Sequence, residues 1–530
     1  MKNIFSSIVI IAVSFSLFAF YPKTTENPTN KAIPVAHFQQ KPSSPISKTL
    51  IVNFFKEYPD LKEYESDVML LYKERKYKAI WHDDKGLIEF AYSLYPKVGL
   101  LKEEGLNASF AYNEAIDRIF NEKPANTLSV PDTDIMLSSM YVFYAQKVYV
   151  GIGSKKIKEI GWFIPTKNIS YGALLNSLLA NPELLNKNEA DMFAQYYSLR
   201  AILKKYRQIE KNGGWDPITA EPSGKELKPF DSTITIGQIR KRLAMEGDLK
   251  QDSKSNFYDE ELMAGIMNYK KRYGLKLHYI IKPENIEQMN EPIGNRIKTI
   301  IVNMERCRWI PPELAKAKEY IIINIPSFRL LFKRDGKTIL ESNVFVGKIM
   351  YETVIFSADM TQIVFSPYWN IPNSIVENEL QSEIVRDKDY LAKHNMEYYK
   401  GGVRQKPGPE NSLGLVKFMF PNSNDIYLHD TPAKSLFDLQ SRAFSHGCIN
   451  VRKAKELALL ILKDDPDWPI KRIEEAMKGE KQTTCILKNK IPVHIGYFTT
   501  WVNDAGEISF FSDIYDRDEN LAGLLVSDAE

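Results

Sequence analysis

The chain has 530 residues, of which 44% are apolar and 26% are charged. This composition is that of an ordinary globular protein, and the length predicts about two to four domains rather than one core. A formal net charge of +3 is too balanced to indicate a nucleic-acid binder. The three cysteines exclude a disulfide framework; although Cys307 and Cys485 could pair, we expect buried free thiols.

An apolar N-terminal run predicts export to the cell envelope. Lys2 precedes a mostly apolar stretch from Ile4 to Phe20, which is long for the core of a signal peptide and short for a membrane span. A buried helix is disfavoured because such a run has almost no polar face. We expect residues 1–21 to be either a cleaved signal peptide or a retained membrane anchor, followed by an extended, proline-rich linker over residues 22–48.

Residues 49–230 are predicted to be mostly helical. Apolar residues recur there at helical spacing, and the predicted helix Met192–Lys211 ends before Gly213 and Gly214. His82 is isolated, and neither a metal-ligand cluster nor a phosphate-binding loop occurs in this part of the sequence. We therefore expect a structural body here rather than a catalytic one.

Two amphipathic helices are predicted within residues 231–300. Their apolar stripes are formed by Ile236, Ile239 and Leu243 and by Leu262, Ile266 and Tyr269. The pair resembles the small helical peptidoglycan-binding fold, although Lys276–Lys282 replaces the Asp-Gly segment that usually follows the last helix. A helical spacer that does not bind glycan is the alternative.

The pattern changes to that of strands near residue 319. Tyr320–Ile325 is rich in isoleucine. Phe328–Arg334 and Lys337–Val346 flank Asp335-Gly336, which is a strong signal for a tight hairpin. These residues predict an antiparallel sheet.

An insertion is predicted between two runs of strands. Residues 376–412 begin with a charged helix, Val376–Lys393, and end in a stretch rich in glycine and proline. Their position before the chemistry-bearing stretch indicates a lid. Ahead of them, Tyr368 and Trp369 could form either a substrate-binding wall or part of the core, and strands return over residues 484–515.

The residues that could carry chemistry gather between Ile426 and Arg452. Cys448 can act as a nucleophile when a base or a positive charge favours its thiolate, and His429 and His446 each offer an imidazole. Gly447 lets the backbone approach a substrate carbonyl and direct amide N–H groups at a developing oxyanion. Spacing alone does not decide which histidine is the base.

A short strand is predicted before Cys448 and a helix after it. Residues 427–430 alternate as a strand would, and Thr431-Pro432 ends them. Arg452–Lys463 has one apolar face and is predicted to be a helix. Cys448 would then lie at a loop-to-helix junction, where the helix dipole favours a thiolate.

His429, followed nineteen residues later by a cysteine within Ser445-His446-Gly447-Cys448, resembles the signature of the L,D-transpeptidase catalytic domain. Other stretches resemble the large YcbB type of this family. They are YKAIW and YRQIEKNGGW in the helical part, and NMERCRWIP, INIPSFRL, VFSPYWNIP, VKFMFPNSNDIYLHDTP and RAFSHGCINV over residues 300–465.

The resemblance implies a multidomain α+β protein. It places an all-α scaffold domain and a peptidoglycan-binding-like domain before a mostly β L,D-transpeptidase catalytic domain. The implied boundaries are 49–230 for the scaffold domain, 231–300 for the binding-like domain, 318–478 for the catalytic domain with a helical lid insertion at 376–412, and 479–530 for a C-terminal strand extension.

The resemblance also implies the activity. Cys448 would be the nucleophile and His429 the proton donor and acceptor of a periplasmic enzyme that forms 3–3 cross-links between peptidoglycan stem peptides. No metal or organic cofactor is implied, and carbapenems would be inhibitors. Residues expected to support the oxyanion and the histidine are His446, Gly447, Ser445 and Asp430. Those expected to bind substrate are Tyr427, Asn450, Arg452, Tyr368 and Trp369.

Alternatives remain open at two points. The family carries arginine or asparagine two residues after the cysteine, and this chain has Asn450 there and Arg452 two positions further, so either could contact substrate. An L,D-carboxypeptidase, or a hydrolase acting at wall-protein links, would use the same acyl-enzyme. A wall-binding scaffold with a decayed site is disfavoured because His429 and Cys448 are both intact.

Overall fold

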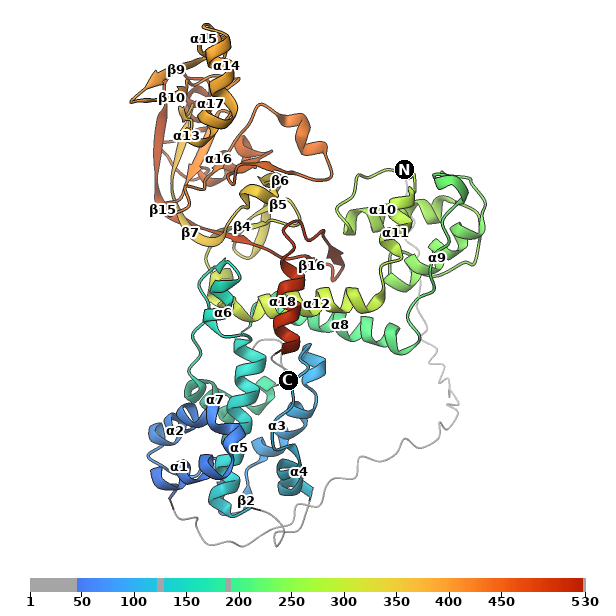
Figure 1. Cartoon of the computed structure of the whole chain (residues 1–530), viewed down its shortest axis with the longest axis vertical. Coiled ribbons are helices and arrows are strands. Elements are labelled where there is room, and N and C mark those ends of the chain that lie inside the picture. Colours follow the sequence, from blue (N-terminus) through green and yellow to red (C-terminus); the bar gives the residue numbers. More distant parts are fainter. Residues whose placement is uncertain (1–44, 122–127, 186–191, 528–530) are drawn as a thin grey trace, which may run out of the picture.

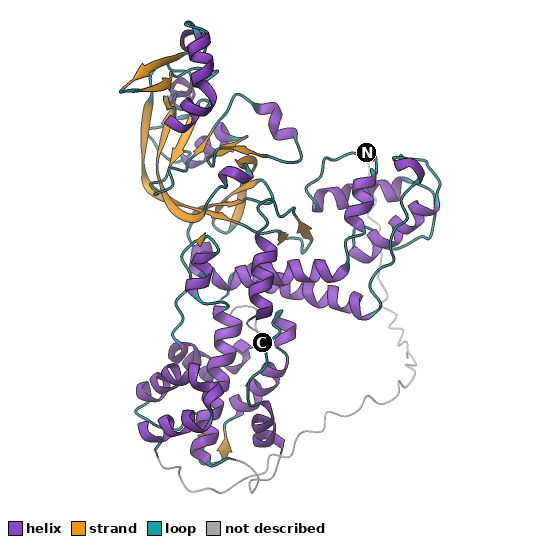
Figure 2. Cartoon of the chain, viewed as in Figure 1, coloured by secondary structure: helices purple, strands orange, loops and turns teal. Residues whose placement is uncertain are grey.

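The structure, a computed structural model, describes residues 45–121, 128–185 and 192–527, so the predicted targeting segment and most of the linker lie outside it. Figure 1 shows a helical body over residues 48–180, a smaller helical unit over residues 234–289 and a sheet-rich part beyond residue 319. Figure 2 shows that nearly all the strands lie in this last part. The predicted fold class, helical domains before a β-rich domain, is confirmed.

The helical body packs around one central helix, α5 (Val130–Ala145), which is buried along almost its whole length. A helix that is buried on all sides must be covered on all sides, and its neighbours provide that cover. None of the helices in the described residues, this one included, is both long and apolar enough to span a bilayer. Its neighbours are α1 (Lys48–Glu57), α2 (Glu65–Glu74), α3 (Glu89–Gly99) and α4 (Asn113–Asn121), and the Tyr141 hydroxyl donates to the first residue of α7 (Tyr171–Ala180). The body also contains α6 (Ser154–Glu159) and a short hairpin of β1 (His82–Asp83) and β2 (Gly86–Leu87).

A fully buried carboxylate, Asp134 on α5, ties the body together. It accepts the backbone N–H groups of Ile80 and Trp81 at 2.9 Å each and the Tyr72 hydroxyl at 2.6 Å. His82 Nδ1 lies 3.0 Å from the same carboxylate, which gives this histidine a structural partner. Because a buried carboxylate is costly unless it is hydrogen-bonded, this network fixes the loop between α2 and α3.

Two long helices connect the helical body to the smaller unit. α8 (Ala194–Lys211) packs against α12 (Ile293–Trp309). Along the chain, these two helices are separated by the helices of the smaller unit, α9 (Ile234–Glu246), α10 (Glu260–Arg272) and α11 (Pro283–Met289). The two predicted apolar stripes face the core of the small unit: Ile236, Ile239, Leu243, Leu262, Ile266 and Tyr269 are all buried.

The sheet-rich part is built on a sheet that closes on itself. The strand order is β11-β12-β14-β6-β5-β4-β15-β7-β3, and β11 also pairs with β7. The predicted hairpin is present between β5 and β6, where Asp335 and Gly336 have φ angles of 49° and 75°. The bounds are β3 (Trp162–Phe163), β4 (Glu319–Asn324), β5 (Arg329–Arg334), β6 (Lys337–Gly347), β7 (Ile355–Phe365), β11 (Val416–Met419), β12 (Leu428–His429), β13 (Ala443–Ser445), which pairs with β6, β14 (Ile449–Val451) and β15 (Thr483–Gly496).

The sheet extends past the predicted boundary at residue 478. β15 lies between β4 and β7, so residues 483–496 form an interior strand rather than a C-terminal extension. The hairpin of β16 (Thr500–Val502) and β17 (Ile508–Phe510) follows, and then α18 (Arg517–Ser527), which was not predicted. β3, from the helical body, adds an edge strand beside β7.

The insertion before β11 contains strands as well as helices. The single helix predicted over Val376–Lys393 is wrong, because the chain leaves the helical conformation at Asp387, whose side chain accepts the Asp389 N–H at 2.9 Å. The predicted glycine-rich exit forms part of a small sheet in the order β8-β10-β9. The elements are β8 (Trp369–Asn370), α13 (Asn373–Ile375), the π-helical turn η9 (Val376–Leu380), α14 (Gln381–Arg386), α15 (Tyr390–Lys393), β9 (Met396–Tyr399) and β10 (Gly402–Gln405).

The Asp134 network yields a stability prediction. Asp134→Ala leaves the backbone N–H groups of Ile80 and Trp81 buried without their acceptor, while the Tyr72 hydroxyl keeps only Ser138 Oγ at 3.0 Å, and we expect a loss of about 3 kcal/mol. Calorimetry of the full chain should show a lower first melting transition, and amide hydrogen exchange at Ile80 and Trp81 should accelerate. Asp84→Ala, at an exposed carboxylate, is the matched control and should leave both readings unchanged. Equal behaviour of the two variants would contradict the role given to Asp134.

Candidate functional site

The site is set by the pairing of two short parallel strands. β12 and β14 pair with Leu428 opposite Ile449 and His429 opposite Asn450. Leu428 and Ile449 are fully buried on the core side. Because side chains alternate along a strand, His429 and Asn450 point to the other face, with Cys448 one position before Ile449.

His429 is held as a neutral imidazole of defined tautomer. Its Nδ1 lies 2.6 Å from the backbone carbonyl oxygen of Asp430. A carbonyl oxygen only accepts, so Nδ1 carries the proton and Nε2 is the basic nitrogen. Burial lowers the pKa of His429 to about 4, against the opposing effect of the Asp430 carbonyl. The imidazole is therefore uncharged near neutral pH and able to accept a proton.

The Cys448 thiol is half-buried and rests in its protonated form. Its Sγ lies 3.6 Å from the backbone carbonyl oxygen of Asp425. Burial raises the pKa of Cys448, while hydrogen bonds from Tyr427 and the positive charge of Lys417 act to lower it. Lys417 Nζ lies 4.6 Å from the centroid of the Tyr427 ring, so the amine, the phenol and the thiol form one group. The resting pair is a neutral thiol beside a neutral imidazole.

A tight turn presents the cysteine. Ser445 Oγ donates to the carbonyl oxygen of Cys448 at 2.5 Å and accepts the Gly447 N–H at 3.2 Å. Gly447 has a φ of 106°, a conformation that side-chain-bearing residues rarely adopt. The Gly447 N–H, one of the predicted oxyanion donors, is therefore engaged, whereas the amides of His446 and Cys448 have no acceptor within the part of the chain that the structure describes.

The predicted helix-dipole effect on Cys448 is wrong. Strand β14 follows the cysteine directly, and α16 (Ala454–Ile461) begins only beyond it. Because the influence of a helix terminus fades within one turn, α16 does not favour the thiolate. Hydrogen bonds from Tyr427 and the charge of Lys417 act on the thiol instead.

Asp430 acts through its backbone rather than its carboxylate. Its side chain pairs with Lys434 and accepts the Leu415 N–H at 3.0 Å. Lys434 Nζ also donates to the carbonyl oxygen of Arg452 at 2.9 Å. These contacts fix the turn after β12 and with it the carbonyl group that orients His429.

The predicted substrate-binding residues fall in different places. Asn450 lies beside His429 on the catalytic face, whereas the Arg452 guanidinium pairs with Asp438 at 2.6 Å. The Arg404 guanidinium covers the Tyr368 ring at 4.2 Å from its centroid, and Trp369 belongs to β8, which pairs with β10 of the insertion. Tyr427 thus lies against the thiol and Asn450 lies beside His429, whereas Tyr368 and Trp369 lie at the start of the insertion.

His446 connects the motif to the insertion. Its ring is exposed, and Nε2 lies 2.7 Å from Glu379 Oε1 on η9. The centroid of the Tyr351 ring lies 5.1 Å from that of the His446 ring. Neither Glu379 nor Tyr351 was predicted from the sequence, and no local motif distinguishes them.

His494, Cys307 and Cys485 lie outside this site. His494 Nδ1 lies 2.8 Å from Ser357 Oγ, and burial lowers its pKa to about 4. Cys307 and Cys485 are buried free thiols. In the described ranges, no group of three or more His, Cys, Asp or Glu side chains is placed to hold a metal ion.

A separate cleft of about 590 Å³ lies between the small helical unit, strands β4–β6 and the β16–β17 hairpin. Arg272, Arg329 and Trp501 are among the residues that line it, and Cys448 and His429 are not. Its carboxylates and cations largely neutralise one another, as in the pairs that Arg272 makes with Glu246 and Asp248. The thiol site is therefore distinct from this cleft.

Two family comparisons match the two main parts of the chain. Residues 318–471 match the L,D-transpeptidase catalytic domain, and residues 66–203 match the Scaffold domain. A protein of Haemophilus influenzae named "Putative L,D-transpeptidase" is 33% identical over 254 residues, which cover 44% of this chain and 50% of the relative. The chain thus spans about half the length of that curated relative.

Solved structures are similar only at a low level. An L,D-transpeptidase from Stackebrandtia nassauensis is 14% identical, with 53% of this chain and 97% of that chain covered and a TM-score of 0.22. L,D-transpeptidase 3 from Mycobacterium tuberculosis, in complex with a faropenem-derived adduct, is 13% identical, with 34% and 60% covered and a TM-score of 0.18. Scores this low carry no weight here, so the identification depends on the two family matches. The chain combines an L,D-transpeptidase catalytic domain with a preceding Scaffold domain, which is the architecture of the large YcbB-type L,D-transpeptidases.

Proposed function

We propose that the protein is a peptidoglycan L,D-transpeptidase that forms 3–3 cross-links through a thioester on Cys448. The observation that carries the proposal is the β12–β14 register, which brings a thiol and a neutral, correctly protonated imidazole to one face of the catalytic domain. The apolar segment at residues 1–21 supports the further proposal that the enzyme acts in the periplasm, outside the cytoplasmic membrane.

The first half-reaction makes the acyl-enzyme. As Cys448 Sγ attacks the carbonyl carbon of the diamino acid in a donor tetrapeptide, His429 Nε2 takes the thiol proton. The amides of Cys448 and His446 are the donors for the oxyanion, and such a contact is worth about 3 kcal/mol. When the intermediate collapses, His429 gives its proton to the nitrogen of the departing D-alanine, and the thioester remains.

The second half-reaction transfers the acyl group. The side-chain amine of an acceptor stem attacks the thioester while His429 accepts its proton, and the new amide forms as the thiolate leaves. The proton on His429 then returns to sulfur, which restores the resting pair. With water in place of the amine the same steps give an L,D-carboxypeptidase or a hydrolase, so the acceptor decides between transfer and hydrolysis.

The insertion is proposed to act as a lid over this face. Glu379 of η9 contacts His446 within the cysteine motif, so residues 376–412 reach the site without placing a cysteine there. A lid that excludes water would favour the amine acceptor over hydrolysis. Small acylating agents need no such enclosure.

Removal of the nucleophile should abolish both reactions. Purified wild type, Cys448→Ala and Cys485→Ala are incubated with tetrapeptide muropeptides, and the products are identified by mass spectrometry. We expect 3–3 cross-linked dimers from wild type and Cys485→Ala, and a loss of more than about 1000-fold for Cys448→Ala. Tripeptides without dimers would identify a carboxypeptidase, and activity of Cys448→Ala within about tenfold of wild type would sink the proposal.

The low pKa of His429 predicts that acylation of Cys448 persists to a lower pH than is usual for a histidine base. The base must be neutral, and since its pKa is about 4, acylation of Cys448 by a carbapenem should stay constant from about pH 8 down to about pH 5 and fall only below that. Stopped-flow rates across this range test the point, with circular dichroism to show that the protein stays folded. A fall with its midpoint near the ordinary histidine value of about 6.5 would contradict the buried, neutral base.

The histidines should differ in importance. His429→Ala removes the proposed base and should reduce cross-linking by about 100-fold or more. His494→Ala and His82→Ala, which change histidines with structural partners, should reduce it by less than about threefold once protein stability is matched. Similar effects from all three would remove His429 from its role.

The lid contact can be tested at one residue. Glu379→Ala breaks the contact with His446, and Glu377→Ala on the same turn is exposed and serves as the control. We expect Glu379→Ala to raise the ratio of hydrolysis to cross-linking several-fold while carbapenem acylation changes by less than about twofold. A parallel loss of both reactions would mean that the insertion builds the catalytic site itself.

A further inference from the structure

The C-terminal segment contacts the loop between β6 and β7, next to the cysteine motif, from outside the region matched to the catalytic domain. Tyr515 lies between β17 and α18 and is buried. Its hydroxyl donates to the carbonyl oxygen of Gly347 at 2.6 Å and accepts the N–H of Thr353 at 3.2 Å. One phenol therefore bridges both ends of the loop between β6 and β7.

Thr353 passes this constraint on to the catalytic turn. Its side chain is fully buried, and Oγ1 accepts the Gly347 N–H at 2.9 Å and donates to the carbonyl oxygen of Gly447 at 2.9 Å. The loop has little room to adapt, because a Cβ at Gly347 would lie 1.9 Å from the Tyr351 carbonyl oxygen. The backbone N–H of Thr353 is thus held by Tyr515 and its side chain by Gly347 while that side chain binds Gly447.

The carbonyl that Thr353 binds belongs to the peptide that joins Gly447 to Cys448. In a planar trans peptide the C=O and the N–H point in opposite directions, so fixing the Gly447 carbonyl fixes the direction of the Cys448 N–H. Within the described residues this N–H has no acceptor, and the proposed mechanism gives it the oxyanion. Its direction is therefore set by a threonine and a tyrosine that do not touch the reacting atoms.

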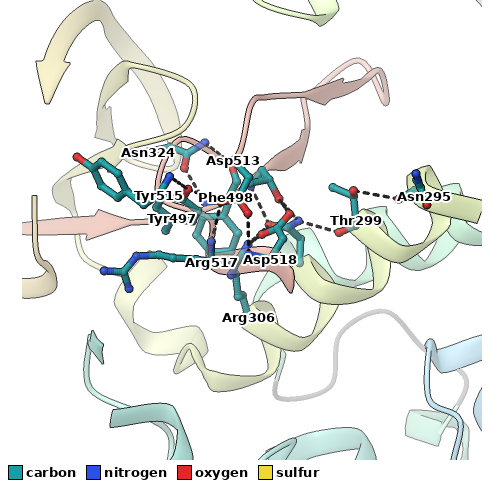
Figure 3. Close-up of polar contacts among 12 residues, drawn as sticks. Asn295, Thr299, Arg306, Asn324, Tyr497, Phe498, Asp513, Tyr515, Arg517 and Asp518 are labelled. Atoms are coloured by element: carbon teal, nitrogen blue, oxygen red, sulfur yellow. Dashed lines mark hydrogen bonds and ion pairs between the residues drawn. The ribbon is translucent and has the colours of Figure 1, made fainter. Parts of the chain in front are cut away.

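Tyr515 is itself firmly anchored (Figure 3). Its backbone N–H donates to the Tyr497 hydroxyl at 2.9 Å, and that hydroxyl binds the Asp513 carboxylate. Asp513 also accepts the Asp518 N–H at 2.8 Å, and Asp518 forms an ion pair with Arg306 of α12 at 2.6 Å. The network thus extends from the last helix before the catalytic sheet to the peptide beside the nucleophile.

We propose that Tyr515 is a positioning residue of the transferase site, which acts through Thr353 to orient the Cys448 amide toward the oxyanion. The proposal rests on the proposed function, because it assigns a purpose to a donor in that mechanism. It predicts that loss of the Tyr515 hydroxyl impairs reactions that pass through a tetrahedral oxyanion and spares reactions of the thiol that do not.

The test compares two reagents on the full-length protein. Meropenem acylates a thiol through a tetrahedral intermediate, whereas iodoacetamide alkylates it by direct displacement without an oxyanion. Both rates at Cys448 are measured by mass spectrometry for wild type, Tyr515→Phe, Thr353→Val and Thr353→Ser. Tyr320→Phe, at another buried tyrosine of the same sheet, is the matched control.

We expect Tyr515→Phe and Thr353→Val to slow acylation by about 10-fold or more, since removing one oxyanion donor outright costs about 100- to 1000-fold. Alkylation should change by less than about twofold. Thr353→Ser keeps the hydroxyl and should acylate at close to the wild-type rate. If Tyr515→Phe does not fold, the threonine variants decide the question alone, because valine keeps the shape of threonine without its hydroxyl, whereas serine keeps the hydroxyl without the methyl group.

Two results would overturn the positioning role. One is acylation of Tyr515→Phe and Thr353→Val within about twofold of Tyr320→Phe. The other is an equal fall in acylation and alkylation, which would indicate general loss of structure around Cys448. Failure of the proposed function is a different result, since the wild-type protein itself would then show no acylation of Cys448 by meropenem.

Discussion

The catalytic face depends on the register of two strands that are only two and three residues long. Leu428 and Ile449 are both fully buried opposite one another, and burial of each such side chain contributes about 2 kcal/mol. A slip of one residue would turn Leu428 onto the polar face of the site and His429 into the apolar core, so the apolar pair selects the register. Hydrophobic burial on one side of the sheet thereby places the imidazole and the thiol on the other.

Burial of the two reacting side chains themselves decides the charge state of the site. It lowers the pKa of His429 and raises that of Cys448, so the pair rests uncharged rather than as a thiolate and an imidazolium. In the proposed mechanism, such a thiol is weakly nucleophilic until its proton moves to His429 during attack. The turn around Gly447 and the hydrogen bonds from Tyr515 through Thr353 would then supply the fixed dipoles that favour the charge formed at that moment. The proposal thus couples reactivity to the presence of a substrate carbonyl.

Local sequence patterns predicted many of the helices and strands, but they could not predict which distant segments of the chain contact one another. The apolar stripes of α9 and α10, the Asp335-Gly336 hairpin and the short strand at His429 follow from neighbouring residues. The break at Asp387 was missed because its side-chain cap competes with a helical charge pattern. The interior position of β15 and the contact of Tyr515 with Gly347 join segments more than 100 residues apart, and no sequence period records such contacts.

The central claim is that Cys448 carries the acyl group, and peptide mapping of the trapped acyl-enzyme tests it most directly. The protein is quenched with acid shortly after mixing with a donor tetrapeptide, digested, and analysed by tandem mass spectrometry. We expect the mass of an acyl tripeptide on the fragment that contains Cys448, and none on the fragments with Cys307 or Cys485, which are buried. An adduct on Ser445 or on any other side chain, or turnover with no covalent adduct, would contradict it.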